Sequence, residues 1–285
     1  MSATLDARAR DREFAFSERD FKRVCELIYA RAGIALSPSK RDMVYSRLSR
    51  RLRVTGHESF SGYLDALERG GGEEWEAFTN ALTTNLTSFF REAHHFDILA
   101  RHLQARRGRR LRIWSCAAST GEELWSLAMT ACEALGTLAP PVEIIGTDID
   151  TQVLQTAARA VYPLERIKGL SPERQRRFLQ RGSGANEGMC RVKPELRALV
   201  TFQPLNLLAE RYDVSGPFDA IFCRNVMIYF DKPTQRTVLQ RLAPLLAEDG
   251  LFFAGHSESF FHAADVLTLT GHTVYRRPGR TAGAA

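Results

Sequence analysis

Short apolar segments alternate with helical segments over residues 111–254 of this 285-residue chain, and few folds accept that pattern. The apolar segments are Leu111–Ser115, Val142–Asp148, Leu199–Gln203, Phe218–Cys223 and Gly250–Ala254, with helical patterns over Gly121–Leu135, Thr151–Ala160 and Pro233–Ala247. Because neighbouring parallel strands need long crossover connections, usually helices, this alternation is typical of a parallel sheet covered on both faces. We therefore expect an α/β fold with a doubly wound sheet.

Two later segments depart from the alternation. Val266–Thr270 and Thr273–Arg276 flank Gly271–His272, which predicts a terminal antiparallel hairpin. Residues 162–198 combine a short helical pattern with the glycine-rich stretch RGSGANEG and short polar strand-like pieces, which predicts a small β-rich insertion in a loop of the sheet. A doubly wound parallel sheet that ends in an antiparallel pair resembles the Rossmann-like fold of class I methyltransferases.

The N-terminal third of the chain predicts helices and no convincing strand. Apolar residues recur there at helical spacing, as at Val44 and Leu48. The basic segment Arg106–Arg110 marks the change to the alternating pattern. We expect an all-helical N-terminal domain over residues 1–105 and an α/β domain over residues 106–285.

The net charge of +6 is unevenly distributed. Residues 37–56 hold Lys40, Arg41, Arg47, Arg50, Arg51 and Arg53 against a single acid, Asp42. On a helix, the stripe that contains Val44 and Leu48 would pack inward while most of the basic side chains project from the other side. Taken alone, such a face is interpreted first as a solvated surface, then as a nucleic-acid-binding surface, and then as a protein-docking surface.

Composition excludes several classes of protein. No uncharged apolar segment approaches the roughly 20 residues that a membrane helix requires. The five cysteines are scattered, odd in number and without CxxC spacing, which argues against a disulfide framework and a zinc cluster. The pair His94–His95 lacks the spacing of known metal motifs, so we predict no metal. We expect a soluble, cytoplasmic protein.

Polar residues follow the ends of the predicted strands, where open α/β sheets bind ligands. The first strand leads into a small-residue turn without the GxGxxG dinucleotide fingerprint, and its Glu122 would suit an ammonium or hydroxyl group. Asp148 could accept both hydrogen bonds of a ribose diol, while Asp150 could instead cap the next helix. Asn206 offers an amide to an adenine edge, and the polar pair Arg224–Asn225 is unusual at a strand end.

The segment Thr84–Arg91 has two interpretations of equal weight. It could be a helix break in which Thr87 or Ser88 caps the next helix, or Arg91 could serve as a charge-assisted donor to an α-carboxylate. With the residues at the strand ends, the second interpretation supplies groups for a ribose, an amine, a carboxylate and adenine. This set matches S-adenosylmethionine better than a dinucleotide.

The motifs NLTSFFREAHHF, RIWSCAASTGEE, GTDID, PLNLL, FDAIFCRNVMIYFD and GLFFAGHSE, spread from Asn85 to Glu258, resemble those of the CheR family of chemotaxis-receptor methyltransferases. One departure is Leu124–Trp125, where the family has Pro-Tyr. The resemblance implies binding of S-adenosyl-L-methionine, with S-adenosyl-L-homocysteine as product. It implies cofactor contacts at Asn85, Thr87, Arg91, Glu122, Asp148, Asn206, Leu207, Arg224 and Asn225.

The resemblance also implies a partner, a receptor that carries γ-methyl esters on glutamate for sensory adaptation. The basic face, with Lys40, Arg47, Arg50, Arg51 and Arg53, would meet the acidic methylation region of the receptor's helical bundle. The insertion, with Gly182, Gly184 and Gly188, would bind a short tether at the receptor's C-terminus. The protein would then be cytoplasmic and recruited to membrane receptor arrays, without inserting into the membrane or binding nucleic acid.

Methyl transfer to a glutamate side chain needs no general base, because a carboxyl group with a pKa of about 4.3 in water is already charged at neutral pH. We expect Arg224 and Tyr229 to orient that carboxylate. The alternatives are a nucleic-acid methyltransferase that uses the basic face and a non-catalytic, cofactor-sensing protein that binds receptors. A dehydrogenase is disfavoured by the missing glycines.

Overall fold

The computed structural model describes residues 12–278, and the chain divides into two compact units between Thr84 and Asn85. This division differs from the expected boundary at residues 105–106. The helix α6 (His94–Gln104) belongs to the second unit because its apolar face, including Leu99, is buried in the same hydrophobic cluster as the strand that follows it. Its helical pattern could not show which unit that face packs against.

The first unit is built from helices with defined ends. They are α2 (Glu18–Ala32), η1 (Pro38–Lys40), α3 (Arg41–Thr55), α4 (Phe60–Arg69) and α5 (Glu73–Leu82). Ser17 and Asp20 form a reciprocal capping box at the start of α2, and Gly33 ends that helix in the left-handed conformation. The stripe predicted on α3 is confirmed, because Val44 and Leu48 are fully buried.

The second unit contains, within the described residues 85–278, a seven-stranded sheet in the order β6-β2-β1-β7-β8-β10-β9. The strands are β1 (Leu111–Ser115), β2 (Val142–Asp148), β6 (Val200–Pro204), β7 (Phe218–Cys223), β8 (Leu246–Ala254), β9 (Thr268–Gly271) and β10 (Val274–Arg276). The five strands from β6 to β8 are mutually parallel, while β10 pairs antiparallel with both β8 and β9. The expected doubly wound sheet with a terminal antiparallel hairpin is confirmed.

The strands bury both faces of the sheet, as a parallel sheet requires. Successive residues of one strand point to opposite faces, so Ile113 and Trp114 of β1 enter different hydrophobic clusters. Helices α6 and α7 (Glu122–Leu135) pack in the cluster of Ile113, and α11 (Lys232–Leu242) packs in that of Trp114. Each large apolar side chain buried in this way contributes about 1.5–3 kcal/mol.

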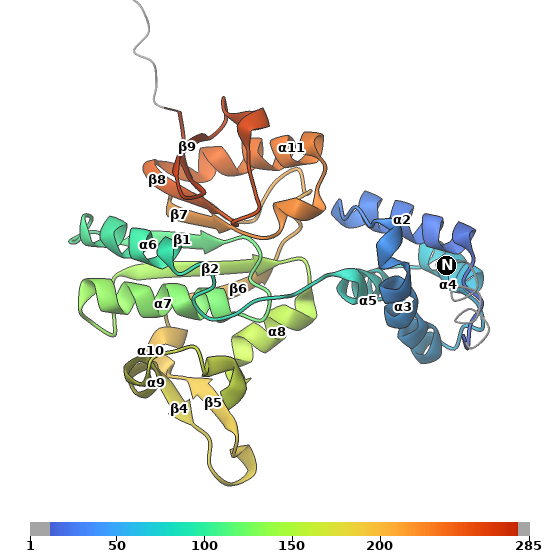
Figure 1. Cartoon of the computed structure of the whole chain (residues 1–285), viewed down its shortest axis with the longest axis horizontal. Helices are drawn as coiled ribbons and strands as arrows, with labels where there is room; N and C mark the ends of the chain where they lie inside the picture. The colour runs from blue at the N-terminus through green and yellow to red at the C-terminus, as the bar shows by residue number, and fades with distance from the viewer. Residues whose placement is uncertain (1–11, 279–285) are drawn as a thin grey trace, which may run out of the picture. The chain divides into compact units, whose positions relative to one another are not determined.

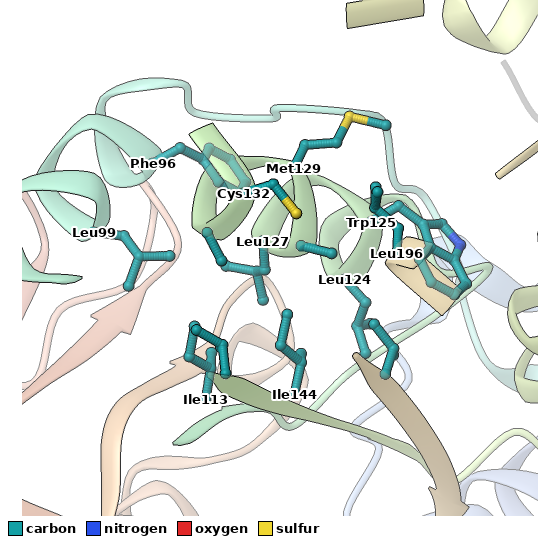
Figure 2. Close-up of a cluster of buried hydrophobic side chains, with 14 of the residues drawn as sticks. Phe96, Leu99, Ile113, Leu124, Trp125, Leu127, Met129, Cys132, Ile144 and Leu196 are labelled. Carbon is teal, nitrogen blue, oxygen red and sulfur yellow. The ribbon is translucent and has the colours of Figure 1, made fainter. Parts of the chain in front are cut away.

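Figure 2 shows how α7 covers the first of these faces, with Leu124 and Leu127 directed toward Ile113 and Ile144. The Leu124–Trp125 pair that departs from the family pattern is fully accommodated. Both side chains are buried, and the Trp125 indole donates a hydrogen bond to the Tyr162 hydroxyl at 2.7 Å. The departure therefore places a buried donor beside a matching acceptor.

The residues between β2 and β6 form a second, three-stranded antiparallel sheet in the order β3-β5-β4. After α8 (Thr151–Arg159) come β3 (Val161–Pro163), η2 (Leu164–Ile167), α9 (Pro172–Phe178), β4 (Leu179–Arg181), η3 (Gly184–Asn186), β5 (Met189–Val192) and α10 (Pro194–Arg197). Figure 1 shows β4 and β5 in yellow, apart from the large sheet. This is the predicted β-rich insertion, which leaves and rejoins the fold between two neighbouring parallel strands.

The end predicted for the last helix differs from the structure. The helical pattern over residues 233–247 ends as α11 at Leu242, and η5 (Ala243–Leu245) follows. Pro244 cannot donate a backbone hydrogen bond to a continuing helix, so the chain turns there and enters β8 at Leu246. The last strand of the parallel set consequently begins earlier than residue 250.

Candidate active site

The order of the parallel strands reverses at β1, which pairs with β2 on one side and with β7 on the other. In open α/β sheets, ligands bind beyond the carboxyl ends of the strands at such a reversal. The connection that leaves β1 is bonded to both neighbouring strands. The amide of Cys116 donates to the Phe222 carbonyl at 2.8 Å, and the amide of Ala118 donates to the Thr147 carbonyl at 2.8 Å. These bonds hold the start of the connection after β1 between β2 and β7.

Asp148 lies at the end of β2 and is almost fully buried. Its Oδ2 accepts from the amide of Ser119 at 2.8 Å and its Oδ1 accepts from the amide of Asp150 at 3.0 Å. Burial raises the pKa of Asp148 to about 6, although these amides oppose the rise. Because each oxygen has two lone pairs, the carboxylate keeps capacity for a further donor, such as a hydroxyl of a ribose diol.

The turn that begins at Asn85 is tied to this edge. The side-chain amide of Asn85 donates to Asp150 Oδ2 at 2.8 Å, and the Ser119 hydroxyl donates to the backbone carbonyl of Asn85 at 3.3 Å. Asp150 also caps α8 by accepting from the amides of Gln152 and Val153, which was one of its two expected roles. The connections after β1 and β2 and the Asn85 turn are thus joined at one place.

The structure does not support helix capping by Thr87 or Ser88, because α6 begins later, at His94, and its first turn has no side-chain cap. The Thr87 carbonyl instead accepts from Arg166 Nη2 at 3.2 Å. The guanidinium of Arg91 is partly exposed and donates to the Leu86 carbonyl at 2.8 Å. That bond closes the turn and leaves other donors on the Arg91 guanidinium.

Glu122 is the first residue of α7, and its side chain is 0% exposed. Its Oε1 accepts from both Nε (3.0 Å) and Nη2 of Arg166, and its Oε2 accepts from the Thr120 hydroxyl at 2.6 Å. A carboxylate beside the N-terminus of a helix is also favoured by the helix dipole. The preceding Gly121 has a φ of 96°, and a Cβ there would approach Ala157 to 2.8 Å, so glycine is required for this turn.

Arg224 follows β7, and its side chain is 1% exposed. Its Nη1 donates to Glu123 Oε2 at 2.8 Å, its Nη2 donates to the Arg91 carbonyl, and Glu92 Oε2 lies 3.2 Å from Nη2. These contacts bind the connection after β7 to α7 and to the Asn85–Arg91 turn. They do not support the expectation that Arg224 orients a substrate carboxylate, because its charge is already engaged by two partly buried acids.

Burial raises the pKa of the Glu92 carboxyl, but the Arg224 guanidinium outweighs burial and holds that pKa below its ordinary value. Next to Arg224, Asn225 has a φ of 58°, and its backbone N–H donates to Glu258 Oε2 at 2.9 Å. Asparagine tolerates this left-handed conformation better than most residues. The Arg224–Asn225 pair therefore shapes the edge through charge and backbone geometry together.

The remaining predicted residues lie on neighbouring connections. After β6, Asn206 Oδ1 accepts from the amide of Leu208 at 2.9 Å and shapes the turn, while Leu207 is buried. Tyr229 ends η4 (Met227–Tyr229), where its half-buried ring packs against the apolar cluster of α11. The predicted cofactor-binding residues therefore lie at carboxyl-end connections of the sheet and on the adjoining turn.

Glu258 and Arg166, for which no role was predicted, also hold this edge together. Glu258 accepts from the amides of Gly255 (2.5 Å), Asn225 (2.9 Å), Met227 (2.8 Å) and Ile228 (3.3 Å). Burial nevertheless raises the pKa of Glu258 above its ordinary value. Its position in the GLFFAGHSE motif was a usable signal, whereas nothing near Arg166 pointed to Glu122.

The basic face of the first unit is partly neutralised by its own neighbours. Arg51 donates to both oxygens of Glu74, at 3.1 and 2.6 Å, and Arg53 donates to Glu13. Arg47 is directed to main-chain carbonyls at the end of α5. Three of the five residues predicted to meet a receptor thus also stabilise the helical unit itself.

Lys40 and Arg50 are exposed, and neither forms an ion pair within residues 12–278. The glycines of the insertion lie in the connection between β4 and β5. Gly184 and Gly188 have φ values of 58° and 82°, and a Cβ on Gly182 would approach the Asn186 carbonyl oxygen to 2.1 Å. All three positions therefore restrict larger side chains.

Across residues 12–278, no group of three or more His, Cys, Asp or Glu side chains is arranged to hold a metal ion. Within the same range, every helix is too short or too polar to cross a membrane.

Comparison with known proteins assigns the chain to a family. Residues 85–276 match the family model "CheR methyltransferase, SAM binding domain", and residues 19–83 match "CheR methyltransferase, all-alpha domain". Chemotaxis protein methyltransferases of Salmonella typhimurium and Escherichia coli are 54% and 55% identical to this chain, each over 92% of it and 91% of the relative. Chemotaxis protein methyltransferase 2 of Pseudomonas aeruginosa is 53% identical over 93% of this chain and 95% of its own. The chain thus belongs to the CheR family and is an S-adenosylmethionine-dependent chemotaxis protein methyltransferase.

Proposed function

We propose that the protein esterifies glutamate side chains of chemotaxis receptors, giving γ-methyl esters for sensory adaptation. The observation that carries this proposal is the grouping of Asp148, Glu122 and the Asn85–Arg91 turn at the carboxyl edge of the sheet, linked by the hydrogen bonds above. Bound S-adenosylmethionine supplies an electrophilic methyl group on a sulfonium sulfur. The partner is inferred from the chemotaxis function of the family.

The polar side chains at this edge match the groups of that cofactor. Asp148 would accept from a ribose hydroxyl, and Glu122 would accept from the ammonium through the remaining lone pair of Oε2. Arg91 would donate to the α-carboxylate with the guanidinium donors that Leu86 does not use. Asn206 and Leu207 would contact adenine, while Asn85, Thr87 and Asn225 would line the site.

Catalysis by this site would be a matter of alignment and exclusion of water. The incoming glutamate is already ionised at neutral pH, so no residue has to remove a proton. Tyr229, half-buried at the same edge, is the proposed orienter of the carboxylate. Arg224 would act indirectly, by holding the connections that surround the site.

The deciding experiment uses the full chain, labelled S-adenosylmethionine and receptor-containing membranes. We expect label in receptor protein that is released as methanol by alkali, as a glutamyl ester requires. Label in nucleic acid would contradict the proposal. Cofactor binding without release of S-adenosylhomocysteine would show a non-catalytic sensor instead.

We propose that the exposed basic residues of the first unit dock on the acidic methylation region of the receptor. The double variant Lys40→Glu/Arg50→Glu is expected to lower kcat/KM on receptors about 10-fold or more, because exposed charges at the edge of an interface steer association. The effect should shrink as salt rises, since exposed charges are screened. Affinity for S-adenosylhomocysteine should stay unchanged.

The matched control for the basic face is Arg53→Gln, which removes one positive charge that already has a partner in Glu13. A smaller loss of kcat/KM is expected for this variant. A double Lys40→Glu/Arg50→Glu variant with wild-type kcat/KM at low salt would show that this face does not dock.

We propose that the insertion binds a tether at the receptor's C-terminus, which would recruit the protein to receptor arrays and raise the effective concentration of substrate. Gly182→Val should distort the β4–β5 connection, because even a Cβ there collides with Asn186. Turnover on receptors that carry the tether is expected to fall by about 10-fold or more, and turnover on receptors that lack it should not change. Gly169→Ala, at an open position of the same insertion, is the control. Equal losses on both receptors would contradict this role.

A further inference from the structure

The insertion supplies side chains to the very segments assigned to the cofactor. Arg166, in η2, forms the ion pair with Glu122 and also donates to the Thr87 carbonyl at 3.2 Å. Tyr162, in β3, donates its hydroxyl to the Thr120 carbonyl at 2.6 Å. The insertion is therefore bonded to both the turn before α7 and the turn after Asn85.

The contacts of Arg166 determine how the Glu122 carboxylate is used. A carboxylate oxygen has two lone pairs, and Arg166 donates twice to Oε1, which saturates it. Oε2 accepts from Thr120 at 2.6 Å and retains one lone pair. Because two N–H groups of one planar guanidinium donate to Oε1, the carboxylate cannot rotate freely.

We propose that Arg166 is a positioning residue of the cofactor site. It holds Glu122 so that Oε2 stays available for the ammonium of the methyl donor, and through the Thr87 carbonyl it holds the turn that carries Arg91. The inference rests on the proposed assignment of Glu122 as a cofactor contact. It gives the insertion a second role, in binding the methyl donor as well as the receptor.

The competing explanation is that Arg166 merely fastens the insertion to α7. A second ion pair offers a direct comparison, because Arg174 of α9 donates to both oxygens of Glu133 at 2.9 and 2.8 Å. Glu133 is near the opposite end of α7 from Glu122. Glu133→Gln therefore weakens the attachment of the insertion without altering Glu122 or the contact to the Thr87 carbonyl, although Arg174 also lies over the ring of Phe90.

The test measures the Kd for S-adenosylhomocysteine by calorimetry on the full chain. Arg166→Gln is expected to raise the Kd by about 10-fold or more, which corresponds to the loss of roughly one charge-assisted hydrogen-bond pair. Glu133→Gln should leave the Kd within about twofold. With receptor membranes and saturating S-adenosylmethionine, kcat of the Arg166→Gln variant should stay within about twofold while KM for the cofactor rises.

Two further variants keep the result interpretable. Arg166→Lys retains the counter-charge of buried Glu122 and is expected to fold, but it loses the planar guanidinium that places two donors on Oε1 and should raise the Kd by about threefold. Adding Arg166→Gln to Glu122→Gln should raise the Kd by less than Arg166→Gln does alone, since part of the effect of Arg166 acts through Glu122 and the rest through the Thr87 carbonyl.

Three outcomes would overturn the role of Arg166. They are an unchanged Kd in both Arg166 variants, an equal rise in Glu133→Gln, and effects of Arg166→Gln and Glu122→Gln that simply multiply. A Glu122→Gln variant with wild-type Kd would have a different meaning. It would overturn the cofactor-site assignment itself, and the inference about Arg166 with it.

Discussion

Arg224→Met is expected to lower the free energy of unfolding by about 3–5 kcal/mol, because it leaves two partly buried carboxylates without their shared counter-charge. The Arg224 side chain is 1% exposed, and its partners Glu92 and Glu123 are 14% and 13% exposed, so solvent can do little to compensate. The same change releases the Arg91 carbonyl, so affinity for S-adenosylhomocysteine should fall as well. Urea unfolding measures the first effect and calorimetry the second.

Arg106→Met is the control for this prediction. Arg106 also makes a two-pronged contact, with Asp249 at 3.0 and 2.6 Å, but that acid is exposed. The expected loss is below about 1 kcal/mol, as for other surface pairs. If Arg224→Met instead kept wild-type stability and cofactor affinity but lost kcat, Arg224 would be the substrate orienter that the sequence analysis expected.

The affinity for S-adenosylhomocysteine is expected to be constant above about pH 7 and to weaken below pH 6. Burial raises the pKa of Asp148 to about 6, so the carboxylate that accepts from the ribose becomes protonated in this range. Binding favours the ionised form, and the Kd can therefore rise by up to about tenfold for each pH unit below the free pKa. Calorimetry from pH 5 to pH 8 measures this dependence.

Folding has the opposite dependence on this group. The pKa of Asp148 rises from 3.8 to about 6, a difference of about two units, so its ionisation costs about 3 kcal/mol of stability at neutral pH. That cost diminishes as the pH falls from 6 toward 4, because the folded state binds the proton more tightly than the unfolded chain. Loss of binding at pH 5 through Asp148 would therefore not reflect unfolding caused by this residue.

Asp148→Asn separates this titration from that of any other group. The variant should bind about 10- to 100-fold more weakly at pH 7, since a charged acceptor is lost. Its Kd should vary little between pH 5 and pH 7. A pH dependence equal to that of the wild-type protein would place the responsible group elsewhere.

Much of the α/β architecture could be predicted from the sequence because it follows from local patterns. Alternation of apolar strands and helices requires a covered parallel sheet, and the residues after each strand must then meet at one edge. Asp148 and Glu122 could be selected for that reason before any contact was known. The stripe of Val44 and Leu48 was equally local, since burial follows the helical period.

The charge of one segment, in contrast, was a poor guide to the net charge that the first unit presents there. Arg51 and Arg53 belong to a basic segment of the sequence, but Glu74 and Glu13 approach them from other parts of the fold. A count of charges along the chain cannot include acids that arrive from other elements. The sequence therefore overestimated how much positive charge the basic face presents.

The sequence by itself determined the sheet, its covering helices and the acids at its edge, because these depend on the order of apolar and polar residues along the chain. The tertiary structure alone decided that Arg166 holds Glu122 and that Arg224 joins Glu92 to Glu123. Arg166 is 44 positions from Glu122, and Arg224 is 101 from Glu123. No periodicity connects residues so far apart, and packing of the whole chain is what brings their charges together.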